Sequence, residues 1–119
     1  MKAAEWYRKA AKQGNVHAQF RLGMCYHTGD GVEQDIVKAV EWYRKAAEQG
    51  KAGAQCFLGL CYDRGEGVER DSVKAVEWFR KAAEQGHADA QFSLGVMHWH
   101  AEGGPEDCAE TRRPPKRKP

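Results

Sequence analysis

Histidine is the side chain in this sequence with the most chemical uses, because it can bind a metal ion or carry a proton near neutral pH. The sequence has five of them: His17, His27, His87, His98 and His100. Only His98 and His100 form a close pair. Two residues apart on a helix, their side chains point in different directions. We therefore expect no metal site here, and structural roles for the histidines.

The four cysteines, Cys25, Cys56, Cys61 and Cys108, form no C-x-x-C pair. Cys56 and Cys61 are five residues apart, which places them on different faces of a helix. This spacing fits neither a zinc site nor a disulfide framework. We expect the cysteines at 25, 56 and 61 to be small apolar core residues and not nucleophiles.

Two glycine-rich segments, Gly29-Asp30-Gly31 and Gly65-Glu66-Gly67, could suggest phosphate or calcium loops. Each follows a helical segment, whereas a phosphate loop follows a strand, and neither has the calcium-loop spacing. No Ser/His/Asp set or carboxylate pair can be argued from spacing. We therefore expect no cofactor and no enzymatic activity.

The composition of the 119 residues, 41% apolar and 30% charged, is that of one globular domain. No apolar run is long enough to span a bilayer, and the first residues lack a secretory signal, so a cytoplasmic location is expected. The net charge is +2, but residues 112–119 carry five positive charges and no negative one. The remainder is acidic, which does not suit nucleic-acid binding.

A motif that returns every 36 residues organises the chain. Residues 35–50 read DIVKAVEWYRKAAEQG and residues 71–86 read DSVKAVEWFRKAAEQG, so only two of sixteen positions differ. Self-similarity with such a period is typical of stacked helical repeats. We say that residues 36 positions apart are in register.

Each period contains two segments with apolar residues at helical spacing. Glu-Trp helices are expected over 36–49 and 72–85, each capped by an aspartate, Asp35 or Asp71, and ended by a glycine, Gly50 or Gly86. Leu-Gly helices are expected over 16–27, 52–63 and 88–99. The two kinds should alternate as antiparallel pairs that stack into a solenoid.

Each Leu-Gly helix carries a glycine in its middle: Gly23, Gly59 or Gly95. A glycine there costs about 1 kcal/mol relative to alanine. Since it recurs in every copy, we expect a neighbouring helix to approach so closely that a side chain would clash.

The motif Ala18-Gln19-x-x-Leu22-Gly23-x-x-Tyr26-x-x-Gly29-x-Gly31-Val32, followed by the Glu-Trp helix, resembles the Sel-1-like repeat, a relative of the tetratricopeptide repeat. The resemblance covers about residues 1–100. It implies an all-α fold, an α-solenoid of about five helices in antiparallel pairs, with a right-handed superhelix and a concave groove. It also implies a non-catalytic adaptor that assembles protein complexes.

The expected organisation is a repeat array over 1–103, followed by a basic, proline-rich tail over 104–119. The array comprises a helix of a partial repeat (1–14), two whole repeats (15–50 and 51–86) and a second partial repeat (87–103). Because both ends are incomplete, self-association through the exposed repeat ends is one expected behaviour.

Comparison of the copies predicts where a partner would bind. The Glu-Trp helices barely vary, whereas the Leu-Gly helices vary along one face, which the family geometry places on the concave side. The candidate partner-binding residues are His17, Arg21, Met24, His27, Phe57, Leu60, Asp63, Arg64, Asp89, Ser93, Val96 and Trp99.

The favoured interpretation is a scaffold that binds another protein or a peptide segment, without a small-molecule cofactor or a membrane. A tolerant solvent surface would produce the same variability. Two other functions stay open: a hydrolase of the cell-wall-acting kind claimed for some relatives, and weak binding of nucleic acid or an anionic surface through the tail.

Overall fold

The structure, a computed structural model, describes residues 2–101, and within that range it contains helices and no strand. The helices are α1 (Lys2–Lys12), α2 (Val16–Thr28), α3 (Ile36–Glu48), α4 (Ala52–Arg64), α5 (Ser72–Glu84) and α6 (Ala88–Ala101). The expected all-α class and helix positions are confirmed. The described residues form six helices where about five are expected, because each partial repeat contributes a whole helix. The expected tail over 104–119 lies outside the described residues.

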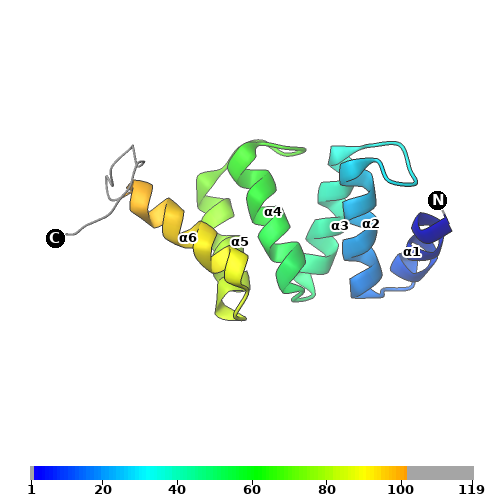
Figure 1. Ribbon diagram of the computed structural model, residues 1–119, viewed down its shortest axis with the longest axis horizontal. Helices are drawn as coiled ribbons and strands as arrows, with labels where there is room; N and C mark the ends of the chain where they lie inside the picture. Colours follow the sequence, from blue (N-terminus) through cyan, green and yellow to red (C-terminus); the bar gives the residue numbers. More distant parts are fainter. Residues whose placement is uncertain (1, 102–119) are drawn as a thin grey trace.

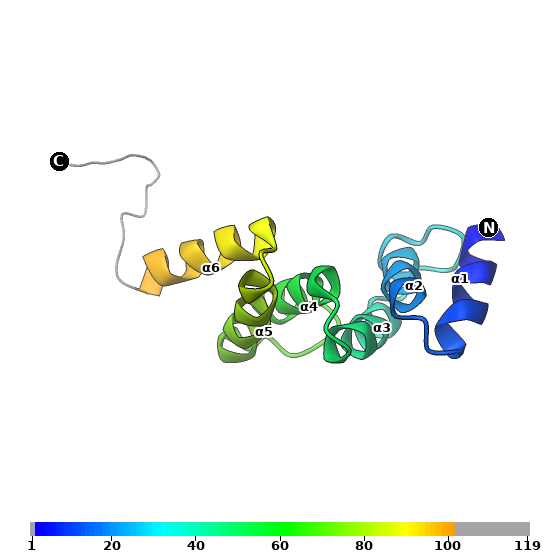
Figure 2. The same cartoon turned by 90° about the horizontal axis from the view of Figure 1, so that it is seen from below.

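The helices follow one another along an elongated molecule with extents of 54 × 26 × 23 Å. Figure 1 shows α1 near one end and α6 at the other. In Figure 2, α2, α4 and α6 lie along one edge, and α3 and α5 lie along the opposite edge. Each helix contacts its sequence neighbours, and the buried residues form two clusters along the stack that share the half-buried Tyr26, not one central cluster.

The helix ends form as the sequence predicts. The Asp35 carboxylate accepts a hydrogen bond from the backbone N–H of Lys38 at 3.1 Å, and Asp71 accepts one from Lys74 at 3.1 Å. These bonds satisfy donors that a helix leaves unpaired at its first turn. Gly50 and Gly86, just after the ends of α3 and α5, have φ of 96° and 89°, in the left-handed region that favours glycine.

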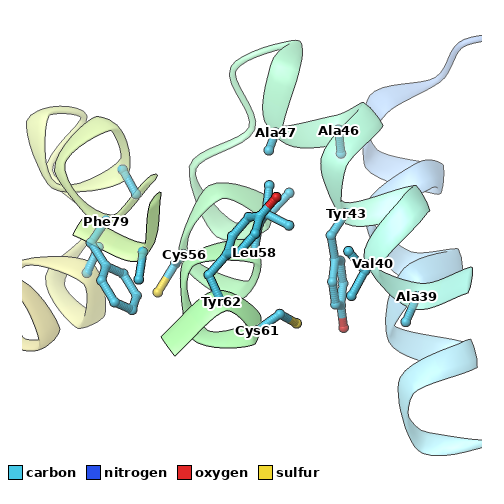
Figure 3. Packing of buried hydrophobic residues seen from close by; sticks show 14 residues of the cluster. Ala39, Val40, Tyr43, Ala46, Ala47, Cys56, Leu58, Cys61, Tyr62 and Phe79 are labelled. Atoms are coloured by element: carbon cyan, nitrogen blue, oxygen red, sulfur yellow. The ribbon is translucent and has the colours of Figure 1, made fainter. Parts of the chain in front are cut away.

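In each helix pair, an aromatic ring of the Glu-Trp helix packs against the glycine in the middle of the Leu-Gly helix. A Cβ on Gly23 would lie 2.8 Å from the Tyr43 ring, and one on Gly59 would lie 2.9 Å from the Phe79 ring. Tyr43 and Phe79 are fully buried. Figure 3 shows the buried side chains of α3, α4 and α5 gathered between the helices, with Cys56 pointing from α4 toward Phe79. The expected close approach is confirmed for these two glycines.

The third glycine of this kind, Gly95, differs. A Cβ placed on Gly95 would meet no atom within 4 Å. In the described part of the chain, α6 packs against α5, and no later helix brings an aromatic ring to it. The expectation that every copy of this glycine is crowded is therefore wrong for Gly95.

Glutamine side chains join the stacked pairs through buried polar contacts. The Gln19 amide donates to the carbonyl of Ala11 at 3.3 Å, and the Gln49 amide donates to the Gln19 oxygen at 2.6 Å. The next repeat reproduces both bonds, with Gln55 donating to Ala47 and Gln85 donating to Gln55. Since a buried amide without partners would be costly, these bonds help to fix the register of the stack.

The three glycines form a matched series for a stability test. Gly23→Ala and Gly59→Ala should each lower the free energy of unfolding by about 1–3 kcal/mol, because the new methyl group overlaps a buried ring. Gly95→Ala should raise it by up to about 1 kcal/mol through helix propensity alone. Urea unfolding followed by circular dichroism measures all three. Equal effects at the three positions would contradict the ring-and-glycine packing.

Candidate functional site

The twelve candidate residues come from the three helices of one edge, and we call the surface that they form the α2–α4–α6 face (Figure 2). Each helix contributes four of them. Those on α2 are His17, Arg21, Met24 and His27; those on α4 are Phe57, Leu60, Asp63 and Arg64; those on α6 are Asp89, Ser93, Val96 and Trp99.

The α2–α4–α6 face combines a half-buried apolar strip with exposed polar side chains. The half-buried apolar members, which pack against the core, include Met24, Phe57 and Leu60. The exposed members are His17, Arg21, Arg64, Asp89 and Trp99. Half-buried apolar side chains together with exposed polar ones are usual components of a protein–protein interface.

Aromatic side chains connect α2, α3 and α4 beneath this face. The Phe57 ring centroid lies 5.4 Å from that of Phe20 and 5.4 Å from that of Tyr43, both in edge-to-face orientation. The Tyr43 hydroxyl lies 3.2 Å from Nδ1 of His27. Edge-to-face pairs add to the stabilisation from apolar burial. Phe57 therefore has a packing role as well as a place on the candidate surface.

Polar contacts also cross between neighbouring helices. Nε2 of His27 lies 3.6 Å from a carboxylate oxygen of Glu66, and the Lys51 ammonium lies 3.1 Å from Nδ1 of His17. These contacts join α2 to the segments before and after α4.

Four residues that touch the candidates were not singled out by the sequence comparison: Phe20, Tyr43, Lys51 and Glu66. Tyr43 recurs as an aromatic residue in register, so its pattern predicts a core residue and gives no sign of the His27 contact. The variability at position 53 has a packing cause: a Cβ on Gly53 would lie 3.1 Å from the Phe20 ring. Variation between copies is therefore not by itself evidence of binding.

A hollow of about 470 Å³ opens between α4, α5 and α6, lined by Asp63, Arg70, Ser72, Val76, Met97, His98 and His100. Its histidines and aspartate invite comparison with a metal site. Across residues 2–101, however, no three histidine, cysteine or acidic side chains are grouped to hold a metal ion.

The cysteines of the described helices are ordinary core residues in their surroundings. Cys56 and Cys61 are 2% exposed, and Cys25 is half-buried. Burial raises the pKa of all three thiols, that of Cys61 to about 11. Because the thiolate is the nucleophilic form, a raised pKa keeps these side chains unreactive near neutral pH.

None of the helices within residues 2–101 is long and apolar enough to cross a membrane.

A family model described as Sel1 repeat matches residues 1–15, 16–51, 52–87 and 88–112. Each of the two complete matches spans one Leu-Gly helix and the Glu-Trp helix that follows it. No curated protein matches the chain.

Three solved structures are similar. A protective antigen from uropathogenic Escherichia coli strains, displaying an SLR fold, is 46% identical with a TM-score of 0.81, over 82% of this chain and 21% of that one. A Sel1 repeat protein from Oxalobacter formigenes is 40% identical with a TM-score of 0.78, over 87% of this chain and 43% of that one. Helicobacter pylori cysteine rich protein B is 30% identical with a TM-score of 0.72, over 76% and 68%. The chain thus spans less than half the length of the first two.

The buried acids Cys61 and Tyr43, whose pKa values are both raised chiefly by burial, predict a loss of stability in alkali. The folded state holds these protons more tightly than the unfolded state. Stability should therefore stay level up to about pH 9, near the ordinary pKa of a thiol, and fall as the unfolded chain ionises first.

Urea unfolding between pH 7 and pH 11 measures this dependence. Cys61→Ala should flatten the fall between about pH 9 and pH 11 by up to about 1.4 kcal/mol per pH unit, the contribution of one proton. An alkaline fall that is identical in the variant and the parent protein would show that Cys61 ionises freely when folded.

Proposed function

Because the chain belongs to the Sel1 repeat family, whose members are generally scaffolds for protein interactions, we propose that it binds a segment of a partner protein along the α2–α4–α6 face. The observation that carries the proposal is the apolar strip with its polar rim, which runs across successive repeats on one edge of the molecule. The repeats act as a rigid frame, and no chemical step is required of them.

The apolar strip sets the chemistry of the partner. Met24, Phe57 and Leu60 are each half-buried, so each offers part of its side chain to a further apolar group. Methionine adapts its shape readily to different partners. A partner segment with apolar side chains on one face, helical or extended, would complete this burial.

The rim sets the orientation of the partner. Arg21 is exposed on α2 and Arg64 is exposed at the end of α4, whereas the acidic Asp89 is exposed at the start of α6. Charges on a rim mainly affect the rate of association and the register of the bound segment. We therefore infer that the partner segment carries acidic groups near α2 and the end of α4.

Charge reversal on the face provides the test. The double variant Arg21→Glu and Arg64→Glu should weaken binding of a partner purified from the source cell about tenfold, equivalent to about 1.4 kcal/mol. Isothermal titration at two salt concentrations measures this, and the loss should shrink in high salt because exposed charges are screened.

Arg80→Glu is the matched control, because Arg80 is exposed on α5, a helix of the opposite edge (Figure 2). It should leave both the affinity and the helical circular dichroism unchanged. Weakening by Arg80→Glu equal to that of the double variant would place the binding surface elsewhere.

A further inference from the structure

The two ends of the described array leave complementary helix faces uncovered. In the middle of the array, each Leu-Gly helix packs with the Glu-Trp helix that follows it, as in α2 with α3 and α4 with α5. Within residues 2–101, α6 is a Leu-Gly helix without such a follower, and α1 is a Glu-Trp helix without such a predecessor. The internal pairs therefore show what each uncovered face is built to contact.

The uncovered face of α6 exposes residues whose counterparts in the internal pairs are buried or half-buried. Phe92 is 74% exposed, whereas Cys56, in register with it, is 2% exposed. Gly95 is exposed, and a Cβ placed on it would have no atom within 4 Å, whereas a Cβ on Gly23 or Gly59 would meet an aromatic ring. Trp99 is 49% exposed at the far end of α6. This face is an apolar surface, and the open space beside Gly95, which we call the slot at Gly95, corresponds to the space that an aromatic ring fills beside Gly23 and Gly59.

Residues 102–119 of the sequence contain no phenylalanine, tyrosine or tryptophan. The position in register with Tyr43 and Phe79 is Pro115. Proline provides no aromatic side chain and interrupts the interior of a helix.

The uncovered face of α1 carries the missing groups. Ala3 is exposed and Tyr7 and Ala10 are half-buried, whereas their in-register counterparts Ala39, Tyr43 and Ala46 are each 0% exposed. Tyr7 therefore has the same position on α1 that Tyr43 has on α3, where the Tyr43 ring packs against Gly23. The uncovered stripe has the spacing of the stripe that α2 buries on α3.

A polar pair marks the same register. In the internal pairs, Gln49 donates to Gln19 at 2.6 Å and Gln85 donates to Gln55 at 2.9 Å. Gln13 of α1 is in register with the two donors. Gln91 of α6 is in register with the two acceptors, and its amide already donates to the carbonyl of Ala83 at 3.1 Å, as Gln55 donates to Ala47. The amide of Gln13 and the side-chain oxygen of Gln91 are thus matched groups at opposite ends of the molecule.

The charges of the two helices are compatible. The α1 sequence holds four basic residues and one acidic residue, whereas Asp89 is the one acidic residue of α6, which holds no lysine or arginine. Bringing α1 and α6 together therefore sets a basic helix against a weakly acidic one.

We propose that the chain associates head to tail, with α1 of one copy packing against α6 of the next as a further helix pair. Tyr7 of one copy fills the slot at Gly95 of the other, and Gln13 donates to Gln91. Because the two contacting faces differ, the assembly always keeps a free α1 face at one end and a free α6 face at the other, so it grows into an open-ended array. This association uses the ends of the stack and leaves the α2 and α4 parts of the α2–α4–α6 face to a partner, whereas Asp89 and Trp99 lie on the helix that the next copy covers.

Sedimentation velocity over a wide range of concentrations tests the proposal on the full chain. The parent protein should show a mean mass that rises with concentration above the 13.4 kDa of one chain. Gly95→Ala should remain at the mass of one chain, because its methyl group occupies the ring slot but touches nothing within the molecule. Ala3→Asp should also remain single, because it places a charge on the uncovered stripe. An acid in the first turn suits the helix itself.

Mixing the two variants identifies the geometry. Gly95→Ala keeps an intact α1 face and Ala3→Asp keeps an intact α6 face, so an equimolar mixture should form pairs of twice the single mass and nothing larger. Lys9→Arg is the control: it keeps the positive charge of α1, and the in-register residues Lys45 and Lys81 are exposed in the internal pairs, so this variant should assemble as the parent does.

Three results would overturn the proposal. One is a parent protein that stays at 13.4 kDa throughout. The second is assembly that persists in both single variants. The third is a mixture of the variants that remains single. A further variant lacks residues 102–119. If this removal shifts the NMR signals of the α6 amides in a single-chain species, the α6 face contacts the chain's own C-terminal residues and the proposal is wrong.

Discussion

The contact on which the whole structure depends is an aromatic ring set against a glycine in the middle of a facing helix. The Tyr43 ring lies 2.8 Å from the place that a Cβ of Gly23 would take, and the Phe79 ring lies 2.9 Å from the place that a Cβ of Gly59 would take. The missing side chain lets two helices approach closely, and the buried ring fills the space between them. The helix-propensity cost of each glycine is thereby offset by packing of a large apolar group.

This contact explains how a short motif produces a regular frame. Each ring belongs to one helix pair, while the buried glutamine amides and the aromatic contacts of Phe57 reach the neighbouring pair. The stack is therefore held by nearest-neighbour contacts, as expected for a solenoid of the Sel1 repeat family. Phe57, a member of the α2–α4–α6 face, is held in position by these contacts.

Much of the fold is predictable from the sequence because short local motifs determine it and recur in each repeat. The aspartate caps, the glycine ends and the apolar stripes all formed as expected. The candidate surface was less predictable. A position can vary between copies because it lies on free surface, or because its neighbour also differs between copies. Gly53 is of the latter kind, because a Cβ there would lie close to the Phe20 ring. The open slot at Gly95 also could not be inferred from its own helix, because crowding there depends on the neighbour that follows.

The central claim is most directly tested by a double-mutant cycle that joins Gly59→Ala with Phe79→Ala, with unfolding measured in a stabilising osmolyte so that all four proteins are folded. If the ring causes the need for glycine, Gly59→Ala will destabilise the parent protein but stabilise the Phe79→Ala protein by about 1 kcal/mol, the helix-propensity gain. The same loss of stability in both backgrounds would contradict the account.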